Sequence, residues 1–66
     1  MLLRESEQNV YSLRMADTTY RVEVNTNYRP FEQRVDIYQH EGITLNKVPN
    51  TEYSDIYAEF MRLRDQ

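Results

Sequence analysis

The chain has 66 residues and a net charge of −3, and 39% of its residues are hydrophobic. A chain of this length forms one small domain, residues 1–66, and buries only about 60% of the surface that its unfolded form exposes. It has no cysteine and a single histidine, which excludes disulfides, thiolate metal sites and thiol nucleophiles. The acidic balance argues against direct binding to nucleic-acid phosphates. We therefore expect no metal, no cofactor and no direct nucleic-acid binding.

No stretch of the sequence approaches the ~20 apolar residues of a membrane helix. Residues 1–7 place carboxylates directly after a short apolar run, which is not the pattern of a signal peptide. Together with the lack of cysteine, this predicts a cytoplasmic protein that does not associate with membranes.

Two alternating segments predict strands at residues 8–15 and 18–25, joined by a tight turn at residues 16–17. In both, every second residue is apolar or aromatic and the residues between are mostly polar. The predicted inward residues are Tyr11, Leu13, Met15, Tyr20, Val22 and Val24. Residues 25–30, with two Asn and one Pro, predict a loop.

A third strand is predicted at residues 32–39, with Val35 and Ile37 inward. Residues 40–42 predict a turn at the only glycine, and residues 43–45 a short edge strand. From residue 50 the apolar spacing changes to that of a helix, with Asn50 or Thr51 as its cap. Its predicted inward stripe consists of Tyr53, Ile56, Tyr57, Phe60 and Leu63. The expected fold class is α+β: a small antiparallel sheet of three to four strands with one C-terminal helix packed on one face (β-β-β-(β)-α).

The predicted helix carries a second row of side chains beside its apolar stripe. Glu52, Asp55 and Glu59 are three and four residues apart, so all three carboxylates lie on one side of a helix. Residues 50–66 hold four acids and two bases, whereas residues 1–49 hold seven and six. We call these three residues the acidic stripe. Two interpretations fit it: a solvated helix face, or an anionic surface that binds a basic groove on a partner.

Three further residues are candidates for partner contact. Tyr28 lies in the predicted loop, and Tyr38 lies on the outer face of its predicted strand. Exposed tyrosines are frequent interface anchors, although either can instead pack over charged neighbours. Asp36 shares the outer face with Tyr38 and would extend the acidic surface. The mixed charges around it predict cross-strand pairs among Arg21, Glu23, Arg34 and Asp36.

Nothing in the sequence indicates an enzyme. His40 and Glu41 are adjacent in the sequence and have the residue types of an acid–base pair. However, adjacent residues of a strand or turn rarely direct their side chains at the same point. With Gly42 as the only glycine, the chain has no phosphate-binding glycine loop. We interpret His40 as a turn residue and predict no catalytic residues.

Over its whole length, the chain resembles the small acidic inhibitors that phages encode, specifically anti-CRISPR proteins acting on type I systems, with subtype I-C as a candidate. It begins Met1-Leu2-Leu3-Arg4-Glu5 and ends Arg62-Leu63-Arg64-Asp65-Gln66. The resemblance lies in length, acidity, lack of cysteine and a strand-rich body with one helix; no motif carries it. It implies a non-enzymatic protein of the bacterial cytoplasm that binds the surveillance complex, Cascade, and blocks target DNA by mimicking nucleic acid.

Two function hypotheses stay open at this point. The first is the acidic inhibitor, which binds a basic groove of a protein or ribonucleoprotein through its carboxylates. The second is a small intracellular binding module, such as an antitoxin or a phage regulatory protein, held by Tyr28, Tyr38 or an edge strand. We expect a monomer in either case, although an open sheet edge also permits a dimer.

Overall fold

The computed structural model describes the backbone of residues 2–29 and 32–65, and the side chains of residues 3–25 and 34–65. The described elements are β1 (Leu2–Glu7), β2 (Val10–Met15), β3 (Thr18–Arg29), β4 (Glu32–Glu41), β5 (Thr44–Lys47) and α1 (Asn50–Arg64). The strands form one antiparallel sheet in the order β1-β2-β3-β4-β5. The predicted α+β class is confirmed, with one strand more than the largest number expected.

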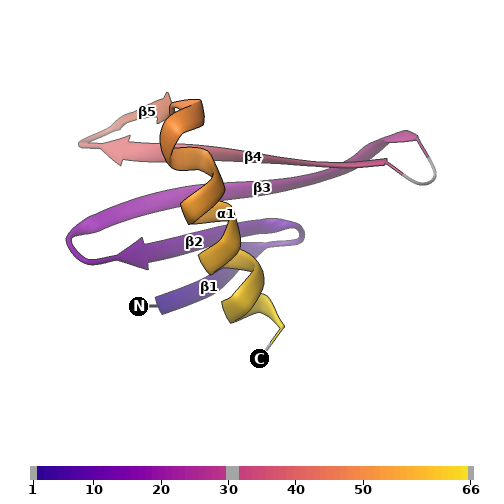
Figure 1. Ribbon diagram of the computed structural model, residues 1–66, viewed down its shortest axis with the longest axis horizontal. Coiled ribbons are helices and arrows are strands. Elements are labelled where there is room, and N and C mark those ends of the chain that lie inside the picture. The colour runs from indigo at the N-terminus through magenta and orange to yellow at the C-terminus, as the bar shows by residue number, and fades with distance from the viewer. Residues whose placement is uncertain (1, 30–31, 66) are drawn as a thin grey trace.

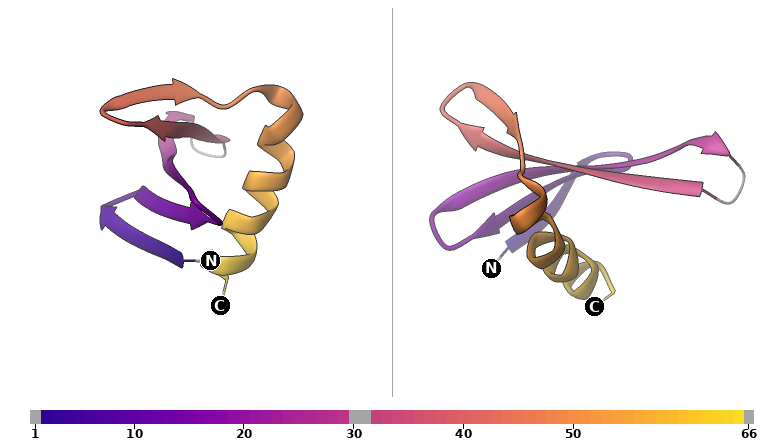
Figure 2. Two further views of the ribbon diagram at one scale, coloured as in Figure 1. Left: turned by 90° about the vertical axis from the view of Figure 1, so that its left-hand side faces the viewer. Right: turned by 45° about the horizontal axis from the view of Figure 1, so that its top comes forward.

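The helix lies across a single face of the sheet. In Figure 1, α1 begins beside β5 and crosses the strands toward β1. Figure 2 shows the sheet and the helix as two layers, with nothing on the other side of the sheet. We call these two sides the covered face and the open face. The long hairpin of β3 and β4 extends beyond the part of the sheet that α1 covers (Figure 1).

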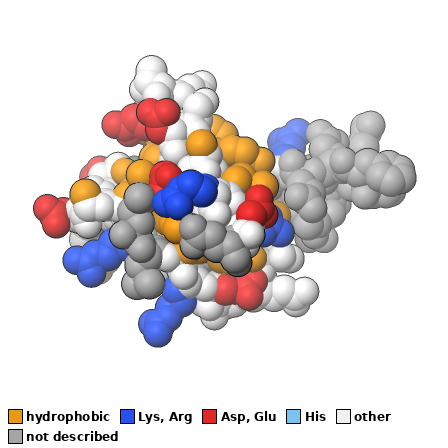
Figure 3. Space-filling model, turned by 60° about the horizontal axis from the view of Figure 1, so that its bottom comes forward, with side chains coloured by type: hydrophobic (Ala, Val, Ile, Leu, Met, Phe, Trp, Pro, Cys, Tyr) orange, Lys and Arg blue, Asp and Glu red, His pale blue; other side chains and the backbone are white. Residues whose placement is uncertain are grey.

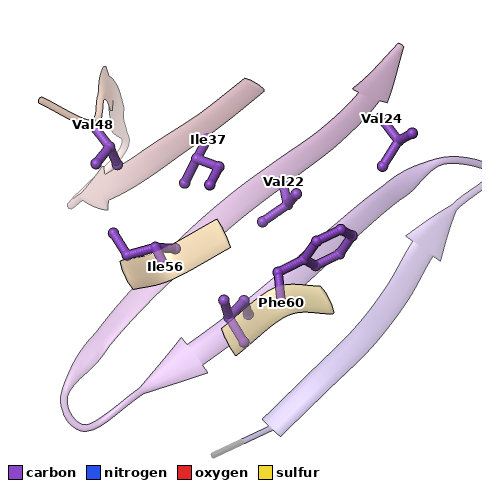
Figure 4. Packing of buried hydrophobic residues seen from close by; sticks show 7 residues of the cluster. Val22, Val24, Ile37, Val48, Ile56 and Phe60 are labelled. Atoms are coloured by element: carbon purple, nitrogen blue, oxygen red, sulfur yellow. The ribbon is translucent and has the colours of Figure 1, made fainter. Parts of the chain in front are cut away.

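Seven buried side chains form the core between the layers (Figure 4). Phe60 is fully buried, and its ring meets that of Tyr11 edge-on at a centroid distance of 5.1 Å, a favoured geometry for aromatic pairs. The core residues are Leu13, Val22, Val24, Ile37, Val48, Ile56 and Phe60. All the inward residues predicted for the strands and the helix belong to this core or pack against it, so the predicted inward face of each of these elements is confirmed.

Three two-residue turns connect β1–β2, β2–β3 and β4–β5, and each contains one residue at positive φ. Such turns fit the right-handed twist of the strands that they join. The residues are Asn9 (φ 65°), Ala16 (φ 52°) and Gly42 (φ 65°). Asn and Gly are favoured there, whereas the Cβ of alanine makes this conformation costly. The predicted turn at residues 16–17 is confirmed.

Several predicted strand boundaries are wrong. β1 was not predicted, because it has no alternating apolar pattern. Among its described side chains, Leu3 is the one apolar residue packed against the core. The first predicted strand begins at Val10, since residues 8–9 form the turn. The predicted loop is also wrong: β3 continues to Arg29, which pairs with Glu32. Strand pairing uses backbone groups, so this polar segment can form it without a core to face.

The turn after β4 and the start of the helix also differ from the prediction. His40 and Glu41 belong to β4, so the turn consists of Gly42 and Ile43, and β5 is shifted to Thr44–Lys47. The N-cap of α1 is Pro49, with no side-chain cap, and not Asn50 or Thr51. The extended conformation of Pro49 (φ −60°, ψ 150°) lets its carbonyl accept hydrogen bonds from the amides of Glu52 and Tyr53.

Candidate functional site

The acidic stripe lies along one flank of α1, beside the buried side chains of Ile56 and Phe60. Glu52 and Asp55 are exposed, and the side chain of Glu59 retains 24% of its accessibility. From the helical rise, the stripe is about 10 Å long. Glu52 stands in the first helical turn, where its charge compensates the partial positive charge of the free amides. The structure therefore brings together the three helical residues of the predicted site.

One end of the acidic stripe is neutralised. The Nε and Nη2 atoms of Arg62 donate to the two carboxylate oxygens of Glu59, each at 2.8 Å, in the two-point geometry that makes arginine–carboxylate pairs specific. These hydrogen bonds lower the pKa of Glu59 and raise the pKa of Arg62. Glu52 and Asp55 have no such partner among the side chains that the structure describes. The negative charge of the stripe that no described arginine neutralises therefore lies at Glu52 and Asp55.

Asp36 and Tyr38 lie elsewhere, on the open face of the sheet. Tyr38 pairs with Arg21 and Asp36 with Glu23, and Ile37 between them is buried on the covered face. Both side chains are half-buried, because neighbouring side chains on the sheet surface cover part of each. The predicted site residues therefore form two groups on opposite sides of the molecule. The side chain of Tyr28 lies outside the described residues.

The pairing of the strands arranges the open face in rows. One row crosses all five strands, and we call it the basic row; it consists of Arg4, Ser12, Arg21, Tyr38 and Lys47. The next row crosses four strands, and we call it the acidic row; it consists of Glu7, Val10, Glu23 and Asp36. The sequence shows these residue types but not their rows, because only the offset between strands decides which residues meet.

The predicted cross-strand charge pairs are wrong for Arg21. It pairs along its own strand with Glu23, with 2.7 Å between Nε and Oε2, while Glu23 stands opposite another acid, Asp36. Like charges directly opposite each other destabilise a strand pair, and Arg21 offsets this repulsion from the neighbouring row. The sequence-based expectation failed because strands β3 and β4 align acid with acid.

Two tyrosines of α1 cover the core beside β4. Tyr53 and Tyr57 stack with their ring centroids 5.8 Å apart. The Tyr53 hydroxyl donates to the Val35 carbonyl, which ties the beginning of the helix to the sheet. Burial, followed by the charges of Tyr57 and Asp36, raises the pKa of Tyr53. Burial at the contact between the helix and the sheet is the main cause of the raised pKa, which therefore needs no functional explanation.

The surface around the helix is mixed in charge. Figure 3 shows acidic and basic side chains interspersed with hydrophobic ones on the side that it presents. Arg64 contributes to this mixture, with its guanidinium 5.9 Å from the ring centroids of both Tyr11 and Phe60. At this distance a cation interacts favourably with the face of an aromatic ring. The two ends of α1 therefore differ in charge, with acids in its first half and Arg62 and Arg64 in its last turn.

Features that would indicate catalysis are few. His40 is exposed. The side chain of its neighbour Glu41 accepts a hydrogen bond from the side-chain Nδ2 of Asn46 at 2.9 Å. Successive strand residues point to opposite faces, so the two side chains do not act on one point. Among the described side chains of residues 3–25 and 34–65, no group of three His, Cys, Asp or Glu residues is placed to hold a metal ion.

In the described part of the chain, no helix has the length and apolar character needed to cross a membrane. Compared with known proteins, the chain matches no family model, no curated protein and no solved structure.

Proposed function

We propose that this protein is a non-enzymatic inhibitor that binds a basic, nucleic-acid-binding surface of a protein complex through the acidic stripe of α1. The observation that carries the proposal is the pair of exposed carboxylates, Glu52 and Asp55, which lie one helical turn apart and have no basic partner among the described side chains. A helix holds them at a fixed spacing, so they can occupy cations that would otherwise bind phosphates.

The resemblance to anti-CRISPR proteins gives the proposal its target. Under it, the partner is the Cascade complex of a type I system, and the protein acts in the cytoplasm of the bacterial host by excluding target DNA. The packing of α1 supports a rigid binding surface, because Ile56 and Phe60 anchor the helix in the core beneath the stripe. The backbone of the helix then needs no ordering when a partner binds, and only the carboxylate side chains lose conformational freedom.

Charge reversal tests the site. Replacing Glu52 and Asp55 with Lys should weaken inhibition of DNA binding by purified Cascade at least about 100-fold, since like charges facing each other at an interface cost several kcal/mol. Glu59 is left unchanged, because its substitution would also break the pair with Arg62. The matched control replaces Glu5 and Asp65 with Lys, two exposed acids outside the stripe. A control that loses as much activity would show that only net charge matters.

A second function is favoured by the open face. The half-buried Tyr38 between Arg21 and Lys47 is the kind of aromatic residue that anchors protein interfaces. In this alternative the chain is a small binding module, such as an antitoxin or a phage regulatory protein. Salt separates the two functions: binding through the acidic stripe should weaken steeply as ionic strength rises, whereas contacts centred on Tyr38 should respond little.

Nucleic acid itself should not be the ligand. The chain has a net charge of −3, and the acidic row runs directly beside the basic row on the open face, so phosphates near Arg21 also meet Glu23 and Asp36. We expect no binding to random duplex DNA or RNA in a shift assay at physiological salt. Micromolar binding there would contradict the proposed mimicry.

A further inference from the structure

The two edges of the sheet are built differently. β1 carries three charges in six residues, Arg4, Glu5 and Glu7, and its pairing is interrupted by a bulge between Glu5 and Glu7. Charges and bulges are the devices by which natural edge strands avoid pairing with other chains. β5 has a single charge, Lys47. The two large hydrophobic residues exposed in the described chain are Leu45 in β5 and Ile43 just before it, at 40% and 104%.

The backbone of β5 has groups available for a further strand. In an antiparallel pair, residues that bond to the neighbour alternate with residues that do not. The Val48 amide donates to the Ile37 carbonyl of β4 at 3.1 Å. Counting back by two, Asn46 and Thr44 direct their amides and carbonyls toward β4, while those of Leu45 and Lys47 point away from the sheet. The whole of β5 is exposed, so these four groups face solvent.

We infer that β5 pairs antiparallel with β5 of a second copy of this chain. In a register centred on Asn46, Leu45 of each copy stands opposite Lys47 of the other. Because these two residues hold the four outward backbone groups, the register satisfies all of them at once, with two hydrogen bonds for each Leu45–Lys47 pair. The contact is isologous, as in most closed homodimers.

Side-chain chemistry favours a second copy in this register. Leu45 and Lys47 lie on the same face, the open one, because they pair with His40 and Tyr38 of β4. The aliphatic stem of each Lys47 can therefore pack on Leu45 of the other copy, and the two ammonium groups do not stand opposite each other. The sheet becomes continuous through both copies, and both helices lie on the same side of it.

The size of the contact sets its strength. Two four-residue strands bury far less than the about 800 Å² per partner of a stable interface, so the dimer forms reversibly and only at high concentration. Sedimentation velocity of the full chain from about 10 μM to about 1 mM covers the range in which such small interfaces associate. We expect the mean mass to rise toward that of a dimer, with little dependence on salt because each contact pairs one charge with an apolar side chain.

Two variants locate the contact. Leu45→Pro removes an outward amide that the fold does not use, and proline is tolerated in edge strands at such positions; we expect a monomer with unchanged circular dichroism. Leu45→Lys places an ammonium group directly opposite Lys47 of the other copy and should weaken association at least about tenfold, because like charges directly opposite each other destabilise a strand pair. The matched control Ser6→Lys adds the same charge to the exposed side of β1 and should dimerise like the unaltered chain.

Three results would overturn the inference. The first is a chain that remains monomeric at the highest concentration, and the second is dimerisation of the Leu45 variants to the same extent as Ser6→Lys. The third is protection of the Leu45 and Lys47 amides from hydrogen exchange only when a different protein is bound, which would assign the edge to a foreign strand. None of these results bears on the acidic stripe, whose binding is tested by charge reversal and weakens with salt.

Discussion

The two faces of the sheet follow different rules. On the covered face, the described residues of β2, β3 and β4 that pack under α1 are mainly apolar or aromatic, and their burial explains their identity. On the open face, charged residues are arranged in a basic row and an acidic row that run across the strands. The residues of the covered face can be identified within each strand from the alternation of apolar and polar residues. The charge rows of the open face depend instead on the register between neighbouring strands.

Glu52 and Asp55 on the helix differ from Glu23 on the open face in whether a basic side chain lies close to them. The net charge of −3 is not spread evenly: the carboxylates of Glu52 and Asp55 are isolated on the helix, while Glu23 lies within reach of Arg21 on the sheet. An isolated exposed carboxylate is available to a partner, and a paired one is partly committed to the fold. The helix side is therefore the better candidate for charge-driven binding, although the strands of the sheet hold more acids than the helix does.

The largest expected effect is on the covered face. Phe60→Ala should lower the free energy of unfolding by about 3–5 kcal/mol, because it removes a fully buried ring and leaves a cavity. For a domain of 66 residues this is most of a total that is on the order of 3–10 kcal/mol. Urea unfolding followed by circular dichroism measures it. Phe60→Asp, which buries an unpaired charge, should abolish cooperative unfolding.

The open face supplies the control for that experiment. Ser12→Ala removes the hydroxyl of a half-buried residue in the basic row and should change the free energy of unfolding by no more than about 0.5 kcal/mol. Equal losses for Phe60→Ala and Ser12→Ala would show that α1 does not pack on this side of the sheet, and the comparison of the two faces would fail.

The core residues of the covered face could be predicted from the sequence, whereas the arrangement of charges on the open face could not. The alternation around Leu13, Val22 and Ile37 and the helical spacing of Ile56 and Phe60 each follow from a single element, so they could be predicted. The pairing of Glu23 with Asp36 depends on the offset between β3 and β4, which no local pattern records. β1 was missed for a different reason: it lacks an alternating apolar pattern, and among its described side chains only Leu3 is an apolar residue packed against the core. The acidic stripe was predicted because it lies within one helix.

A smaller effect is expected where the helix meets β4. Tyr53→Phe removes the hydrogen bond to the Val35 carbonyl and should lower the free energy of unfolding by about 1 kcal/mol near neutral pH. The matched control is Tyr57→Phe, which removes a hydroxyl with no hydrogen-bond partner among the described residues and should cost less. Thermal unfolding of both variants at pH 7 measures the difference, and equal losses would contradict the role of this hydrogen bond.

The same tyrosine predicts a dependence on alkaline pH. The pKa of Tyr53 is raised above 10.0 in the folded chain, so the unfolded chain loses its phenolic proton first as pH rises. The stabilisation is therefore fully present below pH 10.0 and is lost as pH rises through the folded pKa. Melting temperatures measured from pH 8 to 11 should fall more for the unaltered chain than for Tyr53→Phe. Parallel curves would contradict the raised pKa.

The smallest expected effect compares one carboxylate from each side of the molecule. Asp36→Asn and Glu52→Gln each remove one negative charge, so they change the net charge equally. Asp36 stands opposite Glu23, and its neutralisation should raise the free energy of unfolding by about 0.2–1 kcal/mol, since opposed like charges destabilise a strand pair. Glu52 lies in the first turn of α1, where losing its charge should lower that free energy by about 0.3–1 kcal/mol. Urea unfolding at low ionic strength should therefore give changes of opposite sign. Changes of the same sign would mean that stability follows net charge alone, and the distinction between a carboxylate opposed within the sheet and one placed on the helix would not hold.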